Sequence, residues 1–154
     1  MSKNAILVVS FGTTKDETRK KNIEAVENEV AAAFSDWTVR RAFTSSIVMR
    51  RLEERGIHVD NVPQAMERLQ EEGFTQAIIL PTHLLPGEEY HKLLDFLAPF
   101  AASFQKLAVA KPLLYGTEDV EEVSAFLKEA YPLQEKEAML FMEHGTGHFA
   151  NHIY

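Results

Sequence analysis

Short apolar runs alternate with stretches of helical periodicity along nearly the whole chain. The runs at residues 5–11, 37–43, 77–80, 107–110 and 138–142 have the length and composition of strands. Between them, apolar residues recur every three or four positions, which indicates amphipathic helices. Strands separated by helices form crossover connections and a parallel sheet covered on both faces. The sequence therefore predicts an α/β fold, a three-layer α/β/α lobe around a parallel sheet of four to five strands.

Turn and cap residues set the expected helix boundaries. Thr44, Ser45 and Ser46 are N-cap candidates for a short helix, which Gly56 ends. Pro63 lies in the first turn of a later helix, whose C-terminus is at Gly73. The predicted helices span residues 14–34, 46–55, 63–73, 88–100 and about 120–127.

Composition limits the classes of partner and metal site. The 154 residues, 45% of them apolar, suffice for one domain with a real core. A net charge of -7 tells against nucleic acid, because phosphate binding needs a basic surface. The chain has no cysteine, so disulfides, iron–sulfur clusters and cysteine zinc sites are excluded. Any metal must be held by His, Asp, Glu or carbonyl oxygen.

The first apolar run is too short for a signal sequence or a membrane span. We therefore expect a cytoplasmic protein with no membrane partner. In a sheet of this kind, ligands bind at the carboxyl ends of the strands. Residues 10–14, 43–46, 82–90 and 143–148 occupy those positions in the predicted fold.

The turn at residues 10–14 offers hydroxyls and backbone N–H groups at a helix N-terminus, which suits an anion. It lacks the glycines and lysine of the known phosphate-binding loops, and a simple Thr N-cap explains it equally well. Glu88 and Glu89 begin a helix after a loop with two prolines. Carboxylates are also favoured there by the helix dipole, so a structural role stays open. His83 and His91, each taken alone, fit a surface or hydrogen-bonded histidine.

His144 directly follows the last predicted strand, within a turn that contains Gly145 and Gly147. A neutral imidazole binds divalent metals and accepts protons near neutral pH. His148 and His152 continue a spacing of four residues, which on a helix would align three imidazoles. The two glycines argue against a helix here, so we interpret His148 and His152 as loop residues and His144 as the functional candidate.

Four segments together resemble one known family. Residues 5–13, 41–45, 87–90 and 141–145 are similar, in order and spacing, to segments of the anaerobic sirohydrochlorin cobaltochelatases. The resemblance covers essentially the whole chain. It implies a chelatase-like lobe with flavodoxin-like topology, and a class II chelatase that inserts Co²⁺ into sirohydrochlorin without ATP or an organic cofactor. Fe²⁺ and Ni²⁺ are alternative substrate metals.

The resemblance also implies roles for individual residues. His144 matches the metal-binding and proton-accepting histidine of the family's first lobe, and Glu89 matches its metal-site glutamate. Arg41 or nearby cations would anchor the carboxylates of the tetrapyrrole. The residues expected beside the tetrapyrrole are Ser10, Phe11, Gly12, Thr13, Thr44 and Ser45.

This chain departs from the family in two respects. Family members have roughly twice its length, and their second lobe contributes another metal-site histidine. Glu143 stands where the family usually has a small residue. We therefore expect residues 1–154 to be a single N-terminal lobe that works with a second copy of itself or with a second chelatase lobe.

Two other functions remain alternatives. One is a module that binds metal or tetrapyrrole without turnover. The other is a flavodoxin-like binder of flavin or nucleotide that uses the turn at residues 10–14, although no complete phosphate-binding motif supports it.

Overall fold

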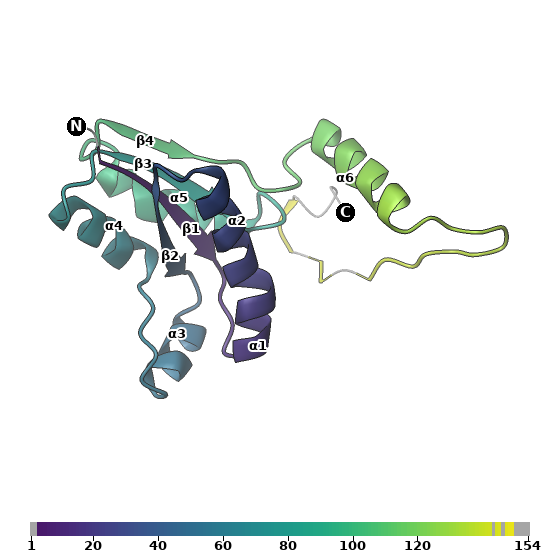
Figure 1. Ribbon diagram of the computed structural model, residues 1–154, viewed down its shortest axis with the longest axis horizontal. Coiled ribbons are helices and arrows are strands. Elements are labelled where there is room, and N and C mark those ends of the chain that lie inside the picture. The colour runs from purple at the N-terminus through teal and green to yellow at the C-terminus, as the bar shows by residue number, and fades with distance from the viewer. Residues whose placement is uncertain (1–2, 143, 146, 150–154) are drawn as a thin grey trace.

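The structure is a computed structural model that describes residues 3–142, 144–145 and 147–149 (Figure 1). The expectations for Glu143 and His152 lie outside the described residues. Among the residues described, no helix is both long and apolar enough to span a membrane.

Four parallel strands form one sheet, as predicted. In chain order they are β1 (Asn4–Ser10), β2 (Thr38–Phe43), β3 (Gln76–Pro81) and β4 (Lys106–Val109). Their spatial order is β2-β1-β3-β4, with β1 paired to both β2 and β3. This is the flavodoxin-like order as far as its fourth strand. It brings the carboxyl ends of β1, β2 and β3 side by side.

The helices follow the predicted periodicity, with one irregularity. The long helix expected at residues 14–34 forms as α1 (Asp16–Thr18), a π-helical segment η1 (Arg19–Glu24) and α2 (Ala25–Ala33). The remaining helices are α3 (Ser46–Glu53), α4 (Val62–Glu71), α5 (Glu88–Leu97), the short 3₁₀ helix η2 (Ala98–Phe100) and α6 (Thr117–Ala130).

Local capping chemistry explains where the helices begin and end. The Ser45 hydroxyl accepts a hydrogen bond from the Val48 N–H and caps α3. Asn61 and Gln64 form a reciprocal capping box at the start of α4. Gly73 ends α4 at φ 77°, a left-handed conformation that glycine adopts without strain.

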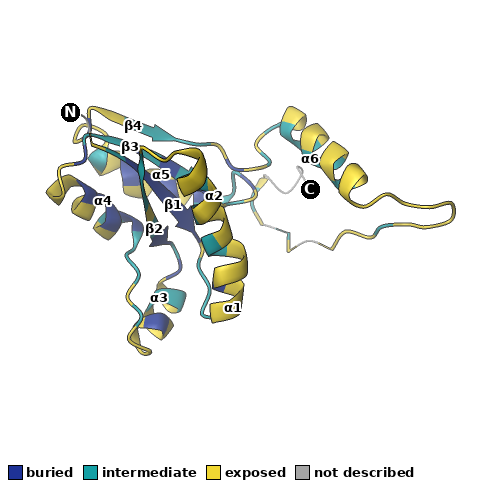
Figure 2. Cartoon of the chain, viewed as in Figure 1, coloured by how far each residue is buried: buried dark blue, intermediate teal, exposed yellow. Residues whose placement is uncertain are grey.

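Helices cover both faces of the sheet (Figure 1). On one face, Leu7 and Ile79 pack in the main core with Met66 of α4 and Leu93 of α5. On the other, the run from α1 to α2 lies across β1 and β2 (Figure 1). Every residue of β1 after Asn4 is buried (Figure 2). The three-layer prediction is therefore confirmed for this part of the chain.

The chain from residue 116 to residue 149, here called the outer arm, is different. Its helix α6 lies off the sheet and has no buried residue (Figures 1 and 2). The strand predicted at residues 138–142 does not form, and Leu140 and Met142 are 93% and 96% exposed. That prediction was wrong because a strand exists only through pairing with a neighbour, and this segment runs apart from the sheet. We call the preceding part, residues 3–115, the lobe.

Candidate metal and tetrapyrrole site

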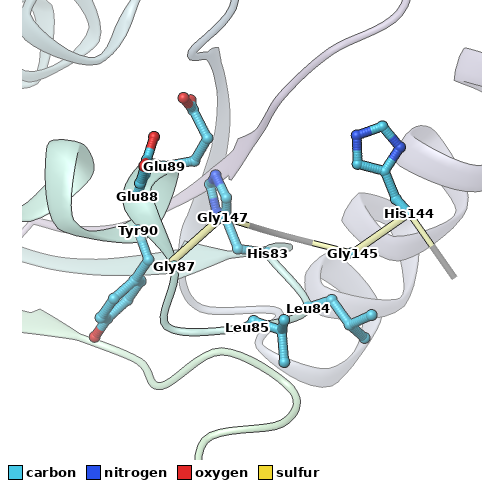
Figure 3. A pocket seen from close by; sticks show the side chains of 10 residues that line it. All are labelled: His83, Leu84, Leu85, Gly87, Glu88, Glu89, Tyr90, His144, Gly145 and Gly147. Atoms are coloured by element: carbon cyan, nitrogen blue, oxygen red, sulfur yellow. The ribbon is translucent and has the colours of Figure 1, made fainter. Parts of the chain in front are cut away.

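A pocket of about 580 Å³ lies between the loop after β3 and the end of the outer arm (Figure 3). Its chemical character is set by two histidines and two glutamates. None of its lining residues is a lysine or an arginine. The lining residues are His83, Leu84, Leu85, Gly87, Glu88, Glu89, Tyr90, His144, Gly145 and Gly147.

The loop after β3 is held in place by backbone hydrogen bonds on both sides. The Thr82 N–H donates to the carbonyl of Val9 on β1, at 2.9 Å. On the other side, the Leu113 N–H donates to the His83 carbonyl at 3.3 Å, and the Leu114 N–H to Leu84 at 2.8 Å. The pocket wall therefore has a fixed backbone, which favours a pre-formed site.

Glu88 and Glu89 occupy the first turn of α5, as predicted. Glu89 accepts a hydrogen bond from Lys92 Nζ at 2.9 Å, and this bond raises the pKa of Lys92. The ion pair is exposed at the surface and therefore contributes little to stability. Both carboxylates also lie where the helix dipole favours negative charge, so their position fits a structural as well as a binding role.

His83 is the least satisfied polar side chain of this loop. Both of its ring nitrogens are buried, and neither has a hydrogen-bond partner among the residues that the structure describes. Burial lowers the pKa of His83, while the charge of Glu89 acts in the opposite direction. A neutral imidazole normally uses one nitrogen as donor and the other as acceptor. In His83, which lines the pocket, the described residues use neither the donor nor the acceptor nitrogen.

His144 lines the same pocket from the outer arm, but it lies across the pocket from Glu88 and Glu89 (Figure 3). Within the described ranges, no three His, Asp or Glu side chains come close enough to hold a metal ion together. His148 packs against His91, with ring centroids 5.1 Å apart, and His91 Nδ1 lies 2.8 Å from the Gly87 carbonyl oxygen. These contacts bring the end of the outer arm to α5.

A second group of unsatisfied atoms follows the carboxyl edge of the sheet. Ser10 ends β1, Thr44 follows β2, and His83 lies two residues beyond β3. The hydroxyl oxygens of Ser10 and Thr44, like the His83 nitrogens, are buried and have no hydrogen-bond partner in the described ranges. We call these three residues the strand-end row. Buried polar atoms normally have partners, so three unsatisfied side chains at the edge where such sheets bind ligands make this edge a candidate binding site.

Comparison with known proteins identifies the family. The family model described as "Cobalt chelatase (CbiK)" matches residues 4–154. The chain belongs to the cobalt chelatase (CbiK) family. It is 36% identical to the sirohydrochlorin cobaltochelatase of Salmonella typhimurium over 154 residues, which is 99% of this chain and 58% of that protein.

A second relative of the cobalt chelatase family is the sirohydrochlorin cobaltochelatase CbiKC of Nitratidesulfovibrio vulgaris. It is 32% identical over 158 residues, which cover all of this chain and 56% of the relative. The chain thus spans a little over half the length of both relatives. Family membership favours the chelatase interpretation over the flavin or nucleotide alternative.

The other candidate residues suggested by the resemblance to the cobalt chelatases lie at the sheet edge. Phe11 is 55% exposed just beyond β1. Gly12 has φ 91°, and a Cβ there would come within 2.5 Å of the Phe43 ring, so only glycine fits. Thr13 Oγ1 accepts from the Lys15 N–H at 3.2 Å. The structure places these residues at one edge with Ser10, Thr44 and Ser45.

Arg41 was expected to anchor a carboxylate of the tetrapyrrole, and its contacts do not favour that role. Its guanidinium binds both carboxylate oxygens of Glu27, with Nε 2.7 Å from Oε1, and also approaches Glu24. These contacts raise the pKa of Arg41. A cation already paired with two glutamates is poorly available to a ligand.

Sequence reasoning left the role of His83 open. Its neighbours Glu88 and Glu89 stood out because they form a pattern at a helix start. A single histidine after a strand carries no such pattern, and only the burial of both ring nitrogens distinguishes it.

Proposed function

We propose that this chain forms the first lobe of a sirohydrochlorin cobaltochelatase and inserts Co²⁺ into sirohydrochlorin. The observation that carries the proposal is the match of residues 4–154 to the cobalt chelatase family. The strand-end row and the cation-free lining of the adjoining pocket support it. Fe²⁺ and Ni²⁺ are further candidate substrate metals.

The proposed chemistry suits the residue types in the pocket. Insertion releases two pyrrolic protons and exchanges the water shell of the ion for four ring nitrogens. In the proposal, Glu89 and His144 hold the ion, and His144 accepts a pyrrolic proton. Imidazole and carboxylate release a transition metal more readily than thiolates would, and the chain has no cysteine.

The tetrapyrrole carries acetate and propionate groups, and the proposal assigns these to the sheet edge. The Ser10 and Thr44 hydroxyls donate hydrogen bonds to carboxylates, next to Thr13 and Ser45 in the adjacent turns. The backbone N–H groups that follow Gly12 lie at the N-terminal end of the helical run that begins with α1, and anions are favoured at such an end. Phe11, which is half exposed, offers an apolar surface to the macrocycle.

In this proposal the second half of the site comes from outside this chain. We propose either a second copy of the chain or a second chelatase lobe, because the described residues bring no complete metal cluster together. Mass in solution distinguishes these sources. A mass of twice 17.5 kDa together with turnover supports the homodimer, whereas turnover that requires an added second lobe supports the other source.

The test is a metal-insertion assay that follows the absorption spectrum of sirohydrochlorin with Co²⁺. We expect turnover to fall at least about a hundredfold in His144→Ala and in Glu89→Gln. His58→Ala, remote from the pocket, is the matched control and retains full activity. Undiminished turnover in both site variants would overturn the assigned roles.

The second candidate is a half-domain that binds Co²⁺ or tetrapyrrole without turnover. It is favoured by the separation of His144 from Glu89 across the pocket (Figure 3). Calorimetric binding of Co²⁺ or sirohydrochlorin, combined with no insertion under any oligomeric condition, would establish this candidate over the first.

A further inference from the structure

We propose that His83 is an additional metal-binding residue, which holds the divalent ion together with Glu89 before insertion. The inference rests on the proposed function, because it adds a ligand to the same site. It assigns a role to a side chain that the resemblance leaves without one.

The first argument is the state of the side chain. Both ring nitrogens of His83 are removed from solvent and lack a hydrogen-bond partner within the described part of the chain. An unmet buried polar group is costly, and native structures rarely keep one without a reason. A coordinated metal would use the lone pair of one ring nitrogen, so that only the N–H of the other would still need an acceptor.

The second argument is the rigidity of the backbone. Hydrogen bonds to β1 on one side and to residues 113–114 on the other fix the loop that carries His83. Metal ligands need this kind of support, since small errors in position weaken coordination. His144, by contrast, lies on the outer arm and follows no strand.

The third argument is the charge of the surroundings, which decides between a cation and an anion. Glu88 and Glu89 line the same pocket, and the lining includes no lysine or arginine. The side chains of His83 and Glu89 lie on the same side of the pocket (Figure 3), and the charge of Glu89 acts to raise the pKa of His83. Lys92 pairs with Glu89 at 2.9 Å but lies outside the lining, so Glu88 and Glu89 together still leave a net negative charge at the pocket. This charge repels a ligand carboxylate and attracts a divalent cation. The pocket therefore favours metal at His83 over a carboxylate of the tetrapyrrole.

The experiment titrates the complete chain with Co²⁺ alone and follows two signals. Visible absorption gives the affinity, and proton NMR detects the strongly shifted N–H resonances of imidazoles bound to paramagnetic Co²⁺. We compare wild type with His83→Gln, Glu89→Gln and His144→Ala, and use His58→Gln as the histidine control. His83→Asn is the second variant, and thermal unfolding verifies that each variant is folded.

We expect His83→Gln and His83→Asn to weaken Co²⁺ binding at least about tenfold and to remove one shifted N–H resonance. His58→Gln leaves both signals unchanged. Wild-type affinity and an unchanged spectrum in both folded His83 variants would overturn the inference. If Glu89→Gln or His144→Ala still weakened binding in that case, the proposed metal site would stand without His83. If no variant changed Co²⁺ binding, both proposals would fail.

Discussion

The lobe and the outer arm have similar amphipathic sequences but very different surroundings. In the lobe, apolar positions of α4 and α5 are buried against a four-stranded sheet. In the outer arm, α6 has a comparable apolar periodicity but buries no residue, and Phe126 is 65% exposed. An apolar stripe predicts that a helix has a partner but does not identify the partner, which is why the two regions differ.

The comparison is tested most strongly by truncating one phenylalanine in each region. Phe43 is fully buried, so Phe43→Ala loses its packing and leaves a cavity. We expect a loss of about 3–5 kcal/mol in the free energy of unfolding. Phe126→Ala in the outer arm should change it by less than about 0.5 kcal/mol. Urea unfolding at equilibrium measures both, and equal losses would show that α6 is packed in solution.

Two glycines, one in the lobe and one in the outer arm, should also differ in how much an alanine substitution lowers stability, although by less. Gly12→Ala combines a strained φ of 91° with a clash against the Phe43 ring, so we expect a loss of about 1–3 kcal/mol. Gly147→Ala places its Cβ in open space, and its effect should stay within about 0.5 kcal/mol. The same unfolding measurement applies, and a larger loss at Gly147 would contradict the assigned surroundings.

The pH dependence of stability tests an ion-pair cluster of the lobe. The hydrogen bonds that His58 makes to the acceptor carboxylates of Glu53 and then Asp60 raise the pKa of His58. Because the folded pKa lies above the unfolded one, the stabilisation is complete below about pH 6.5 and is lost as pH rises through the folded pKa. His58→Gln should therefore destabilise the protein at acidic pH only. Thermal unfolding across pH measures this, with His144→Gln in the outer arm as control.

Removing the outer arm should have the smallest effect on the lobe. A chain that ends at residue 115 keeps the whole sheet and the contacts of residues 113–114 with the loop after β3. We expect its melting temperature to change by less than about 4 °C. Differential scanning calorimetry measures the change, and loss of a cooperative transition would show that the outer arm supports the core.

The predicted helices and strands formed where a local sequence pattern coincides with burial of the same segment in the core. The strands around Leu7 and Ile79, the capped start of α3 at Ser45 and the glutamates at the start of α5 all follow from patterns of a few residues. The strand at residues 138–142 was wrong, because its formation depends on a pairing partner that an apolar run cannot specify.

Some residues of the candidate site could likewise be placed from the sequence, and others could not. Ser10, Thr44 and Glu89 could be placed at one edge of the sheet because each follows a strand of a predicted parallel sheet, and the structure puts them there. The position of His144 relative to Glu89 could not be derived, because it depends on the path of the outer arm. The orphaned nitrogens of His83 are a property of three-dimensional burial and leave no signal in the sequence.

Strand β1 has a consequence for measuring ligand binding. The strand pairs with a neighbour on each side and its residues after Asn4 are buried, so we expect hydrogen exchange there to require unfolding of the whole lobe. The strand ends in Ser10, at the row where the ligand is proposed to bind. A ligand that binds only the folded chain lowers the population of the globally unfolded state by the factor 1 + [L]/Kd. The amide exchange rates of β1 would then report affinity for the edge at which it ends, without any label on metal or tetrapyrrole.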